Sequence, residues 1–308
     1  MAGFDTVVVV TRKTRLAELI ERFNTRAQAK FYIEHAGGEF GEYEAEDAAY
    51  RRALEIVRRA VEVGLKIQVL DRELVPSYAF LPSDVVVTLG QDGLVANVAK
   101  YAAGQPIVAV NPDPARFDGI LLPFLPEGAG GALARTLEGR QPMRPVTLAE
   151  ARLADGQRLL AFNDLFIGAR THVSARYRLR WKSAEEAQSS SGVLVATGAG
   201  STGWLSSVFQ MASGMATWAG GVPLRPLRLP WEDPRLVFVV REPFVSRHSA
   251  ATIVTDVISP GEHLVLESSM PAGGVIFSDG IEADHLAFNS GATVTVGAAA
   301  EAAHLVVA

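Results

Sequence analysis

Short apolar runs and amphipathic segments alternate along the first 125 residues of the chain. Residues 16–34 and 44–63 carry apolar positions at helical spacing, with a glycine-containing break between them. Four runs of mostly β-branched or aliphatic residues indicate strands, at residues 7–10, 64–70, 85–89 and 105–110. Strands that alternate with helices are typical of a parallel sheet with crossover helices. The pattern therefore predicts an N-terminal α/β domain over residues 1–125.

The pattern changes near residue 126, where the segments "PEGAGG" and "RQPMRP" flank one short helical stretch, Ala132–Leu137. The C-terminal half of the chain consists mostly of short strand-like runs, and Asp155-Gly156 is a hairpin signal. The segment "AEEAQSSS" is predicted to be a short polar loop. Closely spaced strands predict a β-rich, sandwich-like domain over residues 126–308.

Composition narrows the classes of function. The chain has 308 residues, of which 48% are hydrophobic, and a formal net charge of −5. It carries no basic stripe of the kind that binds nucleic acid. The absence of cysteine excludes disulfides and thiolate chemistry, and the six histidines lack metal-ligand spacing, so no protein metal site is predicted. A strand begins almost at the N-terminus, and no apolar run reaches membrane-spanning length. We expect a soluble, cytoplasmic protein with neither a nucleic acid nor a membrane as partner.

The segment Gly198–Gly203 satisfies the spacing of the dinucleotide-binding glycine motif and follows a strand. No acidic residue lies between Trp204 and Trp231, where that motif requires one. Ser201 fits a hydrolase nucleophile poorly, because Ala199 replaces the first glycine of that motif. Two interpretations remain open: a turn that approaches a sugar or phosphate closely, and a flexible connection.

Other polar residues interrupt apolar segments. Asp92 lies in a Gly-Gln-Asp-Gly turn between a strand and a helix, where its carboxylate and nearby backbone N–H groups can face a ligand. Asn163 and Asp164 fall inside an apolar strand and point to opposite faces, which suits ligand binding or a strand irregularity. Asn111 follows a strand in a proline-rich loop. The basic loop 12–15 suits phosphates or a solvated surface.

These segments, in this order, resemble the NAD kinase family, and most closely its mitochondrial-type branch. The stretch Gly90–Leu94 is similar to the family's G-G-D-G-T turn, Asn163-Asp164 to its Asn-Glu pair, and Gly200–Trp204 to its Gly-Ser-Thr turn. The branch is indicated by "VVVVTRKTR", "VNPDP", "SSG" and "VREPFVSR", and Asp279-Gly280 also fits. The resemblance covers most of the chain.

The resemblance implies an N-terminal α/β domain, a C-terminal β-rich domain, an active site between them and a homodimer or higher homo-oligomer. It implies ATP-dependent phosphorylation of the adenosine-ribose 2′-hydroxyl of NAD to NADP, with Mg²⁺ carried by the nucleotide. Asp92 would be the general base. Gly90, Gln91 and Gly93 would bind the donor phosphates. The NAD-binding residues would be Asn163, Asp164, Thr202, Trp204 and Ser207.

Several positions depart from the family pattern. Gln91 replaces a glycine, so any positive φ at this position would be costly. Leu94 replaces a threonine and removes a hydroxyl donor, and Asp164 is one methylene shorter than the usual glutamate. Ser191 replaces an aspartate found in most of the family. These departures leave open a catalytically weak or inactive homologue that senses NAD(P)(H). A related lipid or sugar kinase is a further alternative, because the glycine-aspartate turn is shared across that superfamily.

Overall fold

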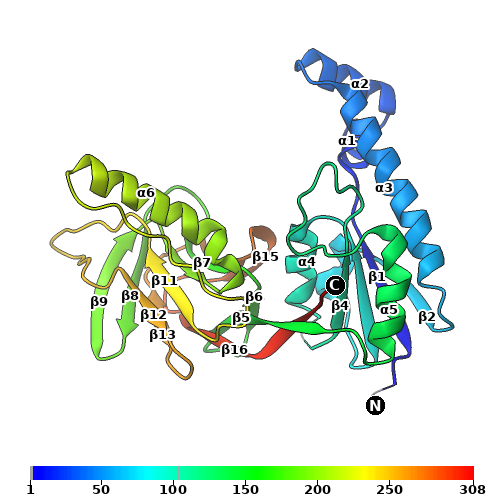
Figure 1. Cartoon of the computed structure of the whole chain (residues 1–308). Coiled ribbons are helices and arrows are strands. Elements are labelled where there is room, and N and C mark those ends of the chain that lie inside the picture. The colour runs from blue at the N-terminus through cyan, green and yellow to red at the C-terminus, as the bar shows by residue number, and fades with distance from the viewer. Residues whose placement is uncertain (1–2, 103) are drawn as a thin grey trace. The chain divides into compact units, whose positions relative to one another are not determined.

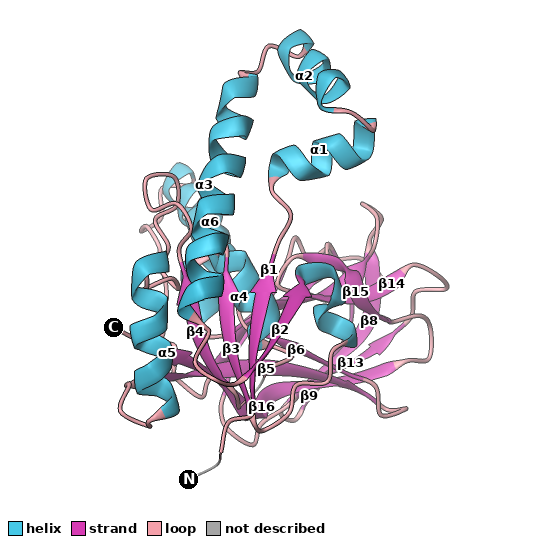
Figure 2. Ribbon diagram, turned by 90° about the vertical axis from the view of Figure 1, so that its right-hand side faces the viewer, coloured by secondary structure: helices cyan, strands magenta, loops and turns pink. Residues whose placement is uncertain are grey.

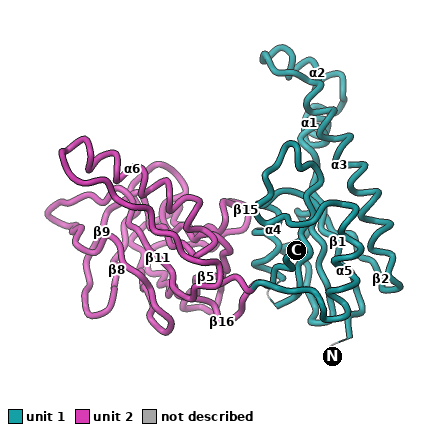
Figure 3. Tube along the Cα trace, in the orientation of Figure 1, with its two compact units in different colours: residues 1–144, 304–308 teal, residues 145–303 magenta. Residues whose placement is uncertain are grey.

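The computed structural model describes residues 3–102 and 104–308, which fold into two compact units (Figures 1 and 3). Unit 1 extends to Arg144 and includes His304–Ala308, and unit 2 is Pro145–Ala303. The boundary predicted from the sequence falls earlier, between residues 125 and 126. Unit 1 is an α/β unit with a parallel sheet and unit 2 is an antiparallel β unit, which confirms the predicted fold class.

Unit 1 is built on the parallel strands β2 (Lys66–Asp71), β1 (Thr6–Thr11), β3 (Asp84–Leu89) and β4 (Pro106–Val110), in this spatial order. His304 and Leu305, near the end of β16 (Thr293–Val306), add to the free edge of β4 in parallel. The valines of β1 and β3 are buried, because α3 (Phe40–Ala60) and α5 (Ala129–Leu137) cover one face and α4 (Asp92–Ala99) packs on the other (Figure 2). Burial on both faces explains these strands' uninterrupted hydrophobicity.

The segment predicted as one helix over residues 16–34 is two helices, α1 (Arg15–Phe23) and α2 (Arg26–His35). Asn24 ends α1 in the left-handed region, with φ 64°. The next residue, Thr25, caps α2 by accepting a hydrogen bond from Gln28 N at 3.2 Å. Asparagine tolerates this conformation and threonine is a good N-cap, so an Asn-Thr pair can divide a periodic pattern.

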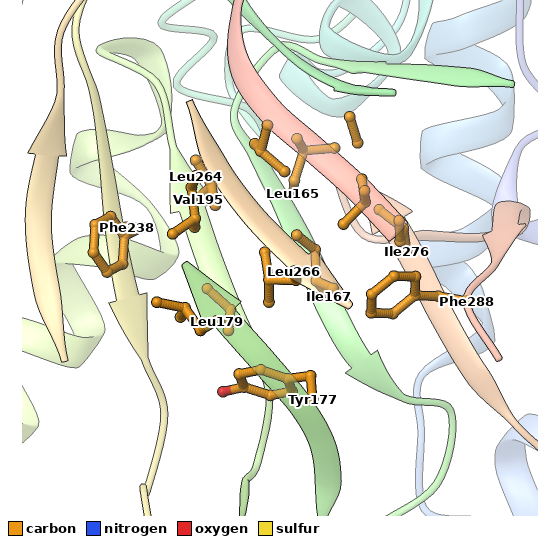
Figure 4. Packing of buried hydrophobic residues seen from close by; sticks show 14 of the residues in the cluster. Leu165, Ile167, Tyr177, Leu179, Val195, Phe238, Leu264, Leu266, Ile276 and Phe288 are labelled. Atoms are coloured by element: carbon orange, nitrogen blue, oxygen red, sulfur yellow. The ribbon is translucent and has the colours of Figure 1, made fainter. Parts of the chain in front are cut away.

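Unit 2 contains two sheets whose inner faces share one core. One sheet has the order β12-β11-β10-β7-β14-β15, and the other contains β16, β13, β8 and β9, with β5 and β6 at its side. Leu165 and Phe238 from the first sheet pack with Leu179 and Leu266 from the second (Figure 4). This is the predicted sandwich-like arrangement. The strands are β5 (Met143–Leu153), β6 (Arg158–Ala161), β7 (Asp164–Ala169), β8 (Ala175–Trp181), β9 (Ala184–Ser190), β10 (Val193–Ala196), β11 (Leu236–Val240), β12 (Thr255–Ile258), β13 (Leu264–Ser268), β14 (Gly274–Ser278) and β15 (Ile281–Ala287).

Three elements of unit 2 differ from the sequence prediction. The segment predicted as a polar loop is the strand β9. Its polar residues can face inward because they form hydrogen bonds; Ser190 Oγ, for example, lies 2.6 Å from the Tyr177 hydroxyl. Two predicted C-terminal strands form the single strand β16. The helix α6 (Trp204–Trp218) follows the glycine-rich turn, and its lack of charge hid its periodicity.

Candidate functional site

The turn after β3 has the geometry of a helix N-terminus. Gln91 is the N-cap residue, with φ −97° and ψ 168°, and α4 starts at Asp92. This φ is negative, so the side chain of Gln91 imposes no left-handed strain on the turn. Gln91 and Gly93 are exposed. Leu94 N donates to Gln91 O at 2.9 Å, whereas the N–H groups of Asp92 and Gly93 have no acceptor among the described residues. The turn can therefore receive an anion.

The carboxylate of Asp92 is half-buried and anchored by one of its oxygens. Its Oδ1 accepts a hydrogen bond from the backbone N of Leu121 at 2.6 Å. Among the described residues, Oδ2 has no hydrogen-bond partner. A carboxylate fixed through one oxygen keeps the other available to accept a proton from a hydroxyl.

Buried side chains of the first loop and of α3 support this turn through hydrogen bonds. The hydroxyl of Tyr50 donates to Leu89 O at 3.1 Å and accepts from Arg12 N at 2.9 Å. Burial raises the pKa of this tyrosine. Arg12 bonds Glu46 at 3.0 Å and its guanidinium lies 5.4 Å from the centre of the Tyr50 ring. Part of the basic loop is therefore structural, since Arg12 is committed to a buried carboxylate.

Glycine at position 90 leaves room for the side chain of Leu94 to pack closely against the turn. A Cβ there would lie 2.7 Å from Cδ2 of Leu94, a residue that is 2% exposed. Leu94 thus fills the space below the turn with an apolar side chain, where the family pattern has a hydroxyl. The side chain at this position therefore offers no hydrogen-bonding group to the turn.

In unit 2 the chain breaks between β6 and β7, so Asn163 precedes a strand instead of lying inside one. Asp279 holds this break: its carboxylate accepts from Phe162 N at 2.9 Å and from Asn163 N at 2.6 Å. Asp279 adopts a left-handed conformation, with φ 54°. Two backbone N–H donors offset the cost of that conformation and fix the chain that leads into Asp164.

The glycine-rich turn 198–203 packs against the same break. Thr197 N donates to Asn163 O at 2.9 Å, and a Cβ on Gly200 would lie 2.0 Å from that oxygen. A Cβ on Gly198 would lie 1.8 Å from Pro230 O. These two glycines are explained by close contact between chain segments, and neither interpretation drawn from the sequence described that role.

A pocket of about 300 Å³ opens beside Asp164 within unit 2. The ring of Phe166 lies nearly parallel to two others, with centroids 5.8 Å from Trp204 and 6.1 Å from Phe277. Phe166 lies over glycine, because a Cβ on Gly192 would stand 2.5 Å from its ring. The result is an aromatic wall suited to stacking a planar ring.

Charged groups line the rest of this pocket. The guanidinium of Arg241 lies 5.1 Å from the centre of the Trp204 ring. Asp164 is 8% exposed, and burial, assisted by the charge of Asp279, raises its pKa to about 7. Near neutral pH this carboxyl can both donate and accept a hydrogen bond, which suits a sugar hydroxyl.

The structure groups the predicted residues into two sets. Gly90, Gln91, Asp92 and Gly93 form the turn of unit 1. In unit 2, Asp164 and Trp204 line the pocket. Its lining does not include Asn163, Thr202 or Ser207.

Phe166, Phe277 and Arg241 were not predicted from the sequence, and no role was predicted for Asp279. Phe166 and Phe277 are direct partners on the neighbouring strands β7 and β14, although more than a hundred positions separate them in the chain. Strand register is not visible in a single sequence. Arg241 belongs to the "VREPFVSR" segment, which carries the family resemblance but suggested no role for any of its residues.

Within the described residues, no helix is long and apolar enough to cross a bilayer. In the same residues, no group of three or more His, Asp or Glu side chains is arranged to hold a metal ion.

No protein-family model and no curated protein sequence matches the chain. Solved structures do. A yeast NADH kinase in complex with NADH has a TM-score of 0.55 and 16% identity, and the match covers 99% of this chain and 84% of that one. An NAD kinase from Archaeoglobus fulgidus in complex with ATP has a TM-score of 0.54 and 16% identity, covering 98% and 93%. At this identity the likeness shows a shared fold, that of NAD kinases.

Proposed function

We propose that this protein is an NAD kinase-like phosphotransferase that phosphorylates the adenosine-ribose 2′-hydroxyl of NAD with ATP to give NADP. The observation that carries the proposal is the turn at Asp92. There a carboxylate with one free oxygen stands at the exposed N-terminus of a helix. Proton acceptance and phosphate binding are the two operations that this reaction needs.

Asp92 acts as general base in the proposed reaction. It orients the ribose hydroxyl and accepts its proton while that oxygen forms a bond to the γ-phosphorus of ATP and the bond to the β-phosphate oxygen breaks. The backbone around Gly90, Gln91 and Gly93 binds donor phosphate oxygens. The negative φ of Gln91 is compatible with this role.

The pocket of unit 2 holds the dinucleotide. Trp204 and Phe166 offer an aromatic face to a heteroaromatic ring, and Asp164 hydrogen-bonds a ribose hydroxyl. Asn163, Thr202 and Ser207 remain in the proposal as residues around the dinucleotide. Mg²⁺ would arrive on the triphosphate and neutralise charge on its oxygens. The mitochondrial-type branch, a homodimer or higher homo-oligomer and a cytoplasmic location are parts of the same proposal, supported by the sequence motifs.

Product formation tests the proposal. Purified protein is incubated with ATP and Mg²⁺ and either NAD or NADH, and NADP or NADPH is separated by chromatography. A parallel series replaces ATP by polyphosphate. Phosphorylated dinucleotide is expected from at least one combination, and its absence from all of them refutes the kinase.

A second function is favoured by the buried Leu94, which removes a hydroxyl from the donor turn. In this alternative the protein binds NAD(P)(H) without catalysis and acts as a sensor. Calorimetry separates the two: a kinase binds ATP–Mg²⁺ as well as a dinucleotide, whereas a sensor binds only the dinucleotide. If neither dinucleotide binds, both functions are excluded.

A further inference from the structure

Unit 2 has a second cavity, of about 340 Å³, that shares no lining residue with the pocket beside Asp164. It lies where the segment 244–250 follows the edge of β9. Phe244 N donates to Ser189 O at 2.8 Å and Ala250 N to Ala187 O at 2.9 Å. One wall of the cavity is therefore formed by part of the segment "VREPFVSR". Of this segment, only Arg241 lines the pocket beside Asp164.

The cavity has an uncommitted positive charge. Arg176 on β8 lines it, and among the described residues its guanidinium has neither an ion-pair nor a hydrogen-bond partner. By contrast, Arg178, two residues along the same strand, bonds Glu185 at 2.8 Å. Ser189 is the direct cross-strand neighbour of Arg176, and its hydroxyl is likewise unbonded in the described part of the chain.

Hydroxyl groups converge from other segments. Ser246 and Ser249 lie with their Oγ atoms 2.8 Å apart, and Ser249 donates to Phe244 O at 2.7 Å. Ser246 is therefore the donor of the pair, and its Oγ also accepts from His248 N at 3.1 Å, so both hydroxyls are bonded within the segment. Ser269 and His248 complete the polar lining. No carboxylate occurs among the described residues that line the cavity.

Gln188 also belongs to the lining, but its side chain offers nothing to a ligand. Its Oε1 atom is fully buried, and its Nε2 donates to Ile253 O at 2.8 Å and to the carboxylate of Glu186. Arg176 and Ser189 are direct cross-strand neighbours on the other face of the sheet, so they are the groups that a ligand can reach.

We propose that this cavity binds the phosphate group of a small phosphate monoester, separately from the dinucleotide pocket. Arg176 and the Ser189 hydroxyl receive the phosphate oxygens, because a charge-assisted donor in a lining without carboxylates favours a dianion. The site does not depend on the proposed kinase activity.

Isothermal calorimetry at constant ionic strength tests the site, with inorganic phosphate and ribose 5-phosphate as probes and full-length protein in the cell. Ribose 5-phosphate and inorganic phosphate are both expected to bind, because the phosphate group makes the proposed contacts. Arg176→Gln should weaken both by about tenfold or more, as expected for the loss of a hydrogen bond to a charged group. Arg176→Lys should restore part of the affinity, because the charge returns without the planar donor geometry.

Arg180→Gln is the matched control. Arg180 lies on the same strand and face as Arg176, is exposed and unpaired among the described residues, and does not line the cavity. Its variant should bind both probes like the wild type. Equal binding by Arg176→Gln and Arg180→Gln, or no binding by the wild type, overturns the proposal. The two proposals can fail independently. NADP formation tests the kinase, and phosphate binding that depends on Arg176 tests this cavity.

Discussion

Two aspartates at strand ends, one in each unit, have contrasting surroundings. Asp92 is half-buried at the N-terminus of a helix, and a single backbone N–H holds one of its oxygens. Asp164 is 8% exposed and stands near Asp279, and its pKa is raised to about 7. A helix N-terminus favours a negative charge, whereas burial beside another carboxylate disfavours it. This contrast supports the proposed division, in which Asp92 accepts the proton and Asp164 hydrogen-bonds a ribose hydroxyl.

The strongest test of this division is Asp92→Asn. An amide cannot accept the proton, so kcat should fall by about 10²–10⁴, the usual contribution of a general base. Steady-state assays at saturating ATP and NAD measure the effect. Asp118→Asn is the control, since Asp118 is exposed in the neighbouring loop. Equal activity of the two variants would remove Asp92 from the chemistry.

Trp204→Ala should act on binding instead of chemistry. Loss of one stacking face should raise the KM for NAD about tenfold while kcat changes little. Trp218→Ala is the matched control, because this tryptophan ends the same helix and is 91% exposed. If both variants behave alike, or if Trp204→Ala lowers only kcat, the pocket does not hold the dinucleotide as proposed.

Asp164 should give the folded protein a pH dependence of stability. Burial and then the charge of Asp279 raise the pKa of Asp164 to about 7, whereas in the unfolded chain it is about 4. The folded state therefore binds more protons between about pH 4 and pH 7, and the contribution of this group to stability falls as the pH rises through that range.

The variant Asp164→Asn lacks that titration. Its free energy of unfolding minus that of the wild type should increase from pH 4 to pH 7, as measured by urea denaturation at several pH values. A difference that stays constant across this range would show that Asp164 does not titrate there.

The smallest effect is expected for Gln91→Gly, which restores the family residue. The backbone of Gln91 is unstrained and its side chain is exposed, so turnover should change by about twofold or less. Initial rates at subsaturating ATP measure this. A gain of tenfold would mean that the side chain obstructs the donor phosphates, and the turn of unit 1 would then be less complete than its backbone suggests.

The two regions also differ in how well the sequence predicted them. The turn at Asp92 is local: a β-branched strand, two glycines and a helical pattern lie within a dozen residues, so spacing alone predicted the turn. The role of Asp92 in it came from the family resemblance. The pocket of unit 2 is assembled from distant strands. Phe166 and Phe277 are neighbours only because of the register between β7 and β14. Asp279, which has a left-handed conformation, bonds the backbone between β6 and β7 although it lies more than a hundred residues away in the sequence.

The most direct test of the division between chemistry and binding is calorimetric titration of NAD into Asp92→Asn. The proposed roles predict an affinity within about twofold of the wild type, although turnover is lost, because the pocket that holds the dinucleotide is untouched. If NAD affinity instead falls together with turnover, Asp92 is a binding residue and the assignment of the two aspartates is contradicted.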